Sequence, residues 1–131
     1  MATIKEDYVS FETAKLLKEK GFDEPCYLGY NKNGEYFPTN NRSNSQIVQP
    51  DFCFICCPTL QMAMKWLREV YNLFIFPFPQ MNTNKFWTEI YQLSDNQEWE
   101  NIYCESIDLQ DYPTYEQAAE AAIKYCLENL I

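Results

Sequence analysis

The sequence predicts an α+β fold, in which a mostly antiparallel sheet of about four to six strands is packed by three helices. Two observations lead to this prediction. Segments at about 10–20, 59–71 and 114–129 repeat apolar residues with helical spacing and begin with helix-capping residues. Between them lie short β-prone runs separated by turn residues, which is typical of antiparallel strands.

The length and composition predict one domain with a packed core. At 131 residues, the chain is long enough to bury most of the surface that its unfolded form exposes. Hydrophobic residues make up 47% of the chain, which excludes a disordered tail. We therefore expect a single compact α+β domain over residues 1–131, with the polar segment 38–50 as a flexible surface loop.

The first and last helices carry clear start signals. Ser10 is the expected N-cap of the first helix, and Gly21 suits the left-handed position after its end. Thr114 and Gln117 form a capping box at the start of the last helix. Apolar residues then continue on one face to position 130.

A hairpin is expected early in the chain. Asn33-Gly34 lies between the β-prone runs 26–30 and 35–37, and both turn residues accept positive φ angles. A short apolar run at 51–56 is expected to form a strand that leads into the central helix.

The second half of the chain predicts a meander of three antiparallel strands. Residues 85–93 alternate and are rich in aromatic and branched side chains, and residues 99–106 provide the next strand. Residues 73–79 are apolar on both alternating faces, which indicates an inner strand whose pairing is limited by Pro77 and Pro79.

The central helix is apolar on more than one side. Met62 and Trp66 lie one helical turn apart and off its main apolar stripe. If exposed, they would form a contact patch, because Trp and Met are enriched in interfaces. The alternative is that the 38–50 loop or another helix covers them, which makes them part of the core.

The charge is unevenly distributed. The net charge is −9, and from Ser94 onward nine acidic residues face a single basic residue, Lys124. Without clustered Lys and Arg to neutralise phosphates, we expect no direct nucleic-acid binding. The acidic residues are better interpreted as a solvated face than as the paired carboxylates of a hydrolase.

Six cysteines raise the question of metal or disulfide chemistry: Cys26, Cys53, Cys56, Cys57, Cys104 and Cys126. A zinc site needs four ligands, usually as two spaced pairs, and the cluster at 53–57 has no second pair. We interpret this cluster as a buried strand, with metal binding or redox chemistry as the alternatives. Because no secretory signal pattern is present, we expect a cytoplasmic protein with free thiols.

Catalytic motifs are missing from the sequence. It has no histidine, no Gly-rich phosphate loop and no serine in a nucleophile elbow. No apolar run approaches the roughly 20 residues that span a bilayer. We therefore expect no enzymatic activity, no cofactor, no catalytic residue and no membrane association.

Three blocks of sequence carry a resemblance to a known family. They are residues 8–23 (YVSFETAKLLKEKGFD), 58–69 (PTLQMAMKWLRE) and 115–128 (YEQAAEAAIKYCLE). Together they resemble a family of small acidic proteins of gut Bacteroidales genomes, prophages and phages, with variable segments between the blocks. The resemblance implies a mobile-element setting and assigns no activity and no functional residue.

The leading functional hypothesis is a small non-enzymatic accessory or protein-binding domain. In a phage or prophage setting, its acidic surface would make it a modulator of a host protein. The expected partner is an unknown protein, and a homodimer is also compatible with the sequence. The candidate contact residues are Met62, Trp66, Trp87 and Trp99.

The alternative hypothesis is a small-molecule or peptide-binding domain. Its ligand would occupy an aromatic cleft, because such sites are mostly apolar with a few polar groups. Some of five aromatic residues would line this cleft: Trp66, Tyr71, Trp87, Tyr91 and Trp99.

Overall fold

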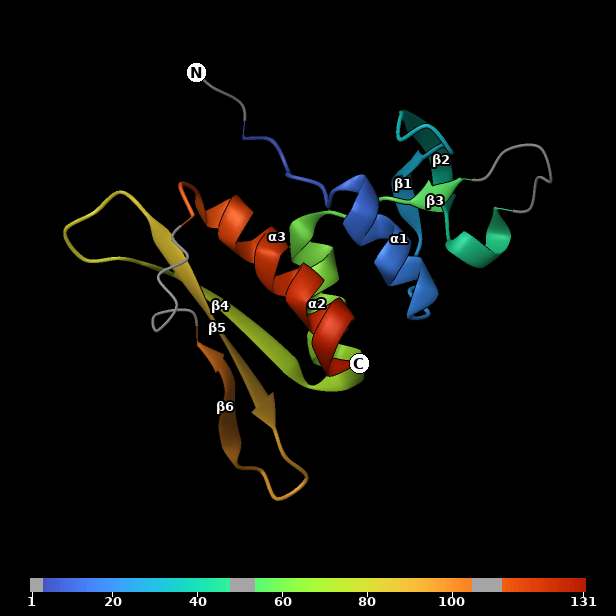
Figure 1. The fold of residues 1–131 in the computed structure, drawn as a ribbon. Helices are drawn as coiled ribbons and strands as arrows, with labels where there is room; N and C mark the ends of the chain where they lie inside the picture. The colour runs from blue at the N-terminus through green and yellow to red at the C-terminus, as the bar shows by residue number, and fades with distance from the viewer. Residues whose placement is uncertain (1–3, 48–53, 105–111) are drawn as a thin grey trace. The chain divides into compact units, whose positions relative to one another are not determined.

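The computed structural model describes residues 4–47, 54–104 and 112–131 (Figure 1). Within these residues, three α-helices and two three-stranded antiparallel sheets form an α+β fold, which confirms the predicted class. The strands form two sheets where the sequence suggested one. The chain divides into two compact units, Met1–Leu60 (unit 1) and Gln61–Ile131 (unit 2). The expectation of one compact domain over residues 1–131 stays a prediction.

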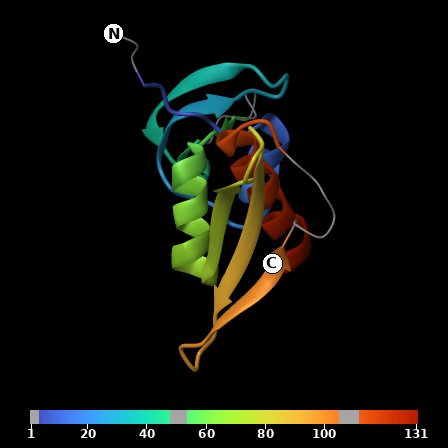
Figure 2. The same ribbon diagram turned by 90° about the vertical axis from the view of Figure 1, so that its left-hand side faces the viewer.

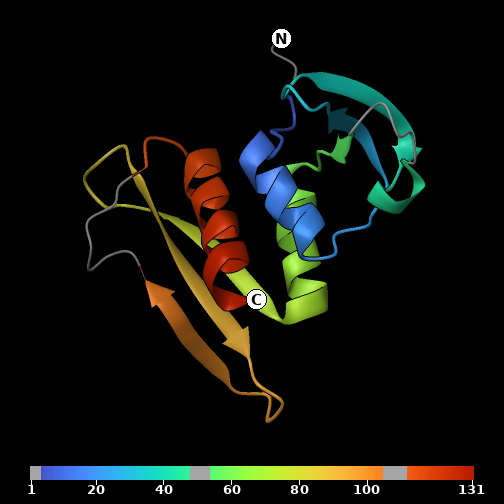
Figure 3. The ribbon, with the colours of Figure 1, turned by 45° about the vertical axis from the view of Figure 1, so that its right-hand side comes forward.

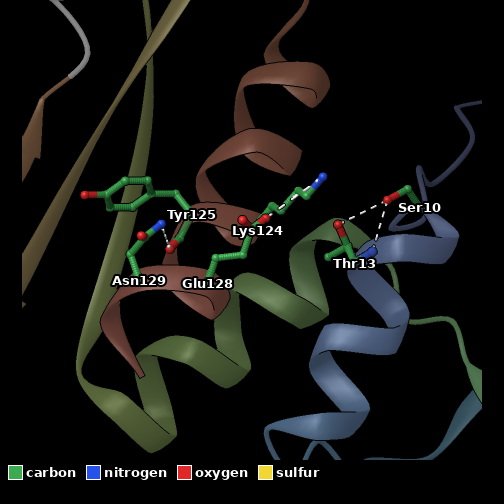
Figure 4. A network of polar contacts seen from close by, with 6 residues as sticks. All are labelled: Ser10, Thr13, Lys124, Tyr125, Glu128 and Asn129. Atoms are coloured by element: carbon green, nitrogen blue, oxygen red, sulfur yellow. Dashed lines mark hydrogen bonds and ion pairs between the residues drawn. The ribbon is translucent and has the colours of Figure 1, made fainter.

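Unit 1 begins with the predicted helix, α1 (Phe11–Glu19). The Ser10 hydroxyl oxygen accepts a hydrogen bond of 3.2 Å from the backbone N–H of Thr13, as expected for an N-cap (Figure 4). Gly21 follows the helix with a φ of 95°, the left-handed conformation in which glycine has no Cβ penalty. The start and the stop predicted for this helix are both confirmed.

The sheet of unit 1 has the order β2-β1-β3. Its strands are β1 (Cys26–Tyr30), β2 (Tyr36–Arg42) and β3 (Ile55–Cys56), all antiparallel. α1 contacts β3. The side chain of Tyr30 is buried, and its hydroxyl donates a hydrogen bond of 2.7 Å to the carbonyl of Val9, which ties β1 to the residues before α1.

The predicted hairpin between β1 and β2 is present, but its turn differs from the expected type. Gly34 has a φ of 79°, whereas Asn33 does not adopt a positive φ. The N–H of Asn31 donates a bond of 2.9 Å to the carbonyl of Glu35, which closes a three-residue loop. Such a loop needs only one left-handed residue, and Gly34 supplies it.

The predicted surface loop at 38–50 is partly wrong. Residues 38–42 belong to β2, because Pro38 pairs with Leu28 and Arg42 pairs with Cys26. Residues 44–46 form a 3-10 turn, η1 (Asn44–Gln46), and residues 48–50 lie outside the described part of the chain. Asparagine tolerates left-handed backbone, so this polar run can hold a bulged strand as well as a loop.

Unit 2 contains α2, a second sheet and α3. The sheet has the order β4-β5-β6 and runs antiparallel from strand to strand, which confirms the predicted meander (Figure 3). The elements of this part of the chain are α2 (Leu60–Tyr71), β4 (Leu73–Pro79), β5 (Phe86–Leu93), β6 (Trp99–Cys104) and α3 (Tyr115–Tyr125).

α3 covers one face of this sheet, which we call the inner face (Figure 3). Leu73, Ile75 and Ile90 are buried on it, and Tyr103 stacks on Tyr125 of α3 with 4.0 Å between ring centroids. The small alanines on α3 allow the helix to pack closely against the strands. They are Ala118, Ala119 and Ala122, all fully buried.

Both ends of α3 are held by local contacts. The hydroxyl oxygen of Thr114 accepts a hydrogen bond of 3.1 Å from the N–H of Gln117, which confirms the threonine part of the predicted capping box. At the other end, the helix continues as a π-helical turn, η3 (Cys126–Leu130). An exposed ion pair of 4.0 Å between Lys124 and Glu128 spans this junction (Figure 4).

Candidate functional site

The face of the β4-β5-β6 sheet that points away from α3 is its outer face (Figure 2). Side chains alternate along a strand, so the residues paired across the sheet share one face. In β4, Leu73 and Ile75 are buried on the inner face, whereas Phe76 and Phe78 are exposed on the outer one. The register pairs Phe78 with Trp87, which places Trp87 on the outer face as well.

Aromatic side chains dominate this outer face. Phe76 is 41% exposed, Phe78 37% and Trp99 55%, and the remaining members are half-buried. We call the set the outer aromatic face; its residues are Phe74, Phe76, Phe78, Trp87, Tyr91 and Trp99. An antiparallel sheet usually turns polar residues to water on its open side, so this composition points to a contact surface.

Ring contacts connect four members of the outer aromatic face along β4 and between β4 and β5. Phe78 approaches Trp87 with 6.0 Å between centroids, and Phe76 meets Tyr91 edge to face at 5.7 Å. Phe76 also lies 6.4 Å from Phe78 along β4. These contacts restrict the rotamers of the rings, so that a partner would meet a preorganised surface.

Carboxylates lie within and beside the outer aromatic face. Glu89 pairs in register with Phe76, and its carboxylate accepts a hydrogen bond of 2.9 Å from the hydroxyl of Tyr91. Asp95 and Glu98 are exposed in the turn that precedes Trp99. The face therefore combines apolar area with negative charge.

The interpretation of residues 73–79 as an inner strand is wrong. In the described part of the sheet, β4 pairs with β5 alone, so it lies at an edge. Its outward apolar residues belong to an open face, and Pro77 and Pro79 protect the edge because proline has no N–H for another strand. These two prolines were the sequence signal for an edge position.

The four predicted contact residues fall into different environments. Trp87 and Trp99 belong to the outer aromatic face, with Trp87 half-buried. Met62 is 39% exposed on α2, whereas Trp66 is 7% exposed and meets Tyr71 edge to face at 5.3 Å. The structure thus joins two of the four on one surface and adds phenylalanines that the sequence analysis did not single out.

A second candidate site is a hollow in unit 1, with a volume of about 170 Å³. Its apolar lining comes from Pro38, Ile47 and Phe54. Its polar lining comes from β2 and η1, and consists of Thr39, Asn40, Arg42 and Gln46. None of the five aromatic residues proposed for a binding cleft lines this hollow.

The cysteines that the structure describes are buried thiols. Cys26, Cys56, Cys57 and Cys126 form no disulfide. Contact with the thiol of Cys56, together with burial, raises the pKa of Cys26, and the same contact lowers the pKa of Cys56. Cys53 lies outside the described residues, as does the side chain of Cys104.

Among residues 4–47, 54–104 and 112–131, no three His, Cys, Asp or Glu side chains are grouped so that they could hold a metal ion. The helices described here all fall short of the length and apolar character needed to cross a bilayer.

A comparison with protein-family models gave no match, and neither did comparisons with curated proteins and solved structures.

Proposed function

We propose that this protein is a non-enzymatic protein-binding module that docks its partner on the outer aromatic face. The observation that supports this most strongly is the exposure of Phe76, Phe78 and Trp99 on one open sheet face. Aromatic residues are enriched in the cores of protein interfaces, and Trp and Tyr are enriched among the residues that carry most of the binding energy.

The charge of unit 2 favours a basic partner. Residues 61–131 contain 11 acidic and 4 basic side chains, a net charge of −7. Glu89 lies within the face, and Asp95 and Glu98 lie beside Trp99. A partner with an apolar patch rimmed by Lys or Arg would be complementary, whereas a second copy of this chain would bring like charges together.

Aromatic sheet faces can also bind single-stranded nucleic acids, whose bases stack on the rings. Such binding requires cationic side chains along the path of the phosphates. β4, β5 and β6 contain no Lys or Arg, and their only charged residues, Glu89 and Glu100, are acidic. This argues for a protein partner.

The resemblance to small acidic proteins of gut Bacteroidales, their prophages and phages suggests where that partner is found. We take it to be a bacterial host protein that this chain modulates. A negatively charged module would be steered towards a basic host surface, and the aromatic rings would then supply most of the contact area.

Affinity capture from a host lysate tests this proposal. The baits are the native chain, Phe76→Thr and Tyr27→Thr, each at low and at high salt. Both substitutions place threonine, a residue that favours strands, where an aromatic residue stood in a strand. Tyr27→Thr is the matched control, because Tyr27 is an exposed aromatic residue (73%) on β1 of unit 1 and lies outside the outer aromatic face. We expect one protein to be enriched by the native chain and by Tyr27→Thr, lost with Phe76→Thr, and reduced at high salt. Equal capture by all three baits would contradict the proposal.

A further inference from the structure

The backbone of β2 is strained where it borders the hollow in unit 1. Asn40 and Asn41 both have positive φ angles, 54° and 60°. Leu28 pairs with Pro38 and Cys26 pairs with Arg42, so a bulge of three residues on β2 faces a single residue of β1. Left-handed conformations of residues other than glycine are unfavourable and persist where the surroundings fix them. Bulges commonly redirect side chains next to binding sites.

Contacts beneath the bulge hold it in place. Thr39 is buried, and its hydroxyl donates a hydrogen bond to the carbonyl of Cys26. A Cβ on Gly29 would lie 2.8 Å from Cγ2 of Thr39, so the glycine is what allows this close approach. The thiol of Cys56 donates a bond of 3.2 Å to the backbone carbonyl of Arg42. The strand that carries Arg42 is therefore fixed from two sides.

Hydrogen bonds also hold η1, which contributes Gln46 to the lining of the hollow. The side chain of Asn44 donates a bond of 2.8 Å to the carbonyl of Phe22, and its oxygen accepts one of 2.8 Å from the N–H of Cys56. Gln46 is held by a capping box with Ser43, in which the backbone N–H of Ser43 donates a hydrogen bond of 3.0 Å to the side-chain Oε1 of Gln46. The hollow is thus preformed, which reduces the entropic cost of binding.

Among the described residues that line this hollow, Arg42 is the one that carries a charge. Its guanidinium makes no hydrogen bond or ion pair with any residue that the structure describes, although it lies on a rigid strand. A guanidinium offers a planar set of donors that matches a carboxylate in a bidentate manner. Phe54 and Ile47 supply apolar surface in the same hollow.

We propose that this hollow binds a small monocarboxylic acid, with its carboxylate on Arg42 and its apolar body against Phe54 and Ile47. The volume of 170 Å³ suits this class, because a cavity of about 150 Å³ holds a benzene molecule. The amide of Asn40 provides a further donor for the carboxylate. This site is independent of the outer aromatic face, which belongs to unit 2.

Titration with benzoate, followed in two-dimensional amide NMR spectra of the whole chain, tests the proposal. We expect saturable shifts for the residues that line the hollow, with a dissociation constant of roughly millimolar order for so small a ligand. Benzamide has the same shape without the charge and should bind at least tenfold more weakly.

Two pairs of variants locate the binding. Arg42→Gln should weaken benzoate binding at least tenfold, whereas Lys32→Gln removes the same charge from the exposed hairpin loop and should leave it within twofold. Asn40→Gly should also weaken it. Asn41 also has a left-handed backbone, but it does not line the hollow. Asn41→Gly therefore relieves the same strain and should leave binding unchanged.

Several results would overturn the proposal. The first is that benzoate causes no saturable shifts in the millimolar range. The second is that benzamide binds as tightly as benzoate. The third is that Lys32→Gln weakens benzoate binding as much as Arg42→Gln does. If Arg42→Gln fails to fold, the comparison of benzoate with benzamide on the native chain still decides, because it requires no substitution.

Discussion

Phe74 and Trp99 meet edge to face across the outer face of the β4-β5-β6 sheet, with 4.7 Å between ring centroids and an interplanar angle of 82°. Phe74 lies on β4 and Trp99 on β6, so the contact joins the two edge strands of the sheet across β5. Aromatic rings thus extend over the full width of the sheet on the side that α3 leaves open.

Substitutions on the two faces of this sheet should lower the free energy of unfolding by different amounts. Trp99→Thr should lower the free energy of unfolding by about 1 kcal/mol, since it removes one ring contact of a side chain that is 55% exposed. Ile90→Ala should lower it by about 2–5 kcal/mol, because Ile90 is fully buried under α3 and its removal leaves a cavity. Urea denaturation measures both values. Equal losses would mean that the outer face is part of a core.

Thr88 offers a stabilising substitution. It is fully buried on the inner face, and its hydroxyl has no hydrogen-bond partner among the residues that the structure describes. Thr88→Val replaces that hydroxyl with a methyl group of nearly the same size, and should raise the free energy of unfolding by about 1 kcal/mol. Thermal denaturation checks this, with Thr88→Ser as the control that keeps the hydroxyl. A lower melting temperature for Thr88→Val than for the native chain would refute the assignment.

Gly29 should tolerate no side chain. A Cβ there would lie 2.8 Å from Thr39 Cγ2 and 2.9 Å from the carbonyl oxygen of Ile55. Gly29→Ala should therefore lower the free energy of unfolding by about 1–3 kcal/mol, as overpacking does elsewhere.

The double variant Gly29→Ala with Thr39→Ser tests the cause of that loss. Removing Cγ2 should recover part of the stability, while the clash with the Ile55 backbone remains. If the loss of stability in the double variant equals the sum of the losses in the two single variants, Thr39 and position 29 do not interact.

The buried thiol of Cys126 predicts a loss of stability in alkali. Burial raises its pKa to about 12 from the ordinary value of 9.0. Because the folded pKa lies above the unfolded one, the stability is complete below pH 9 and falls as the pH rises from 9 towards 12. One such thiol adds a slope of about 1.4 kcal/mol per pH unit in that window.

Urea denaturation at several alkaline pH values checks this slope against Cys126→Ala. The variant should be less stable at neutral pH, because it leaves a cavity, but should lose stability less steeply above pH 9. Tyr30 and Cys26 also have raised pKa values, Tyr30 mainly through burial and Cys26 mainly through its contact with Cys56, so some slope should remain. Identical slopes would contradict the role of Cys126.

Local chemistry explains why the helices could be predicted from the sequence. The caps at Ser10 and Thr114 and the left-handed Gly21 depend on residues within a few positions of each other. The same holds for the turns of the β4-β5-β6 meander, where Asn82 and Gln97 take left-handed conformations. Such short-range contacts are visible in a single sequence.

The candidate sites depend on long-range pairing and were harder to predict. Residues 73–79 are apolar on both faces, and the sequence alone does not say that one of those faces stays open. The bulge of β2 forms because Arg42 pairs with Cys26, sixteen positions away in the sequence, which composition does not reveal. Composition alone therefore predicts a loop for the polar segment that contains this bulge.

The central claim is that the outer aromatic face binds a protein partner. The most direct measurement is the affinity of the captured host protein for the native chain, Phe76→Thr, Trp99→Thr and Tyr27→Thr, determined by calorimetry. We predict that each substitution in the face weakens binding at least tenfold, the loss of about 1.4 kcal/mol expected for an important interface residue, while Tyr27→Thr stays within twofold. Equal affinities for all four proteins would contradict the claim.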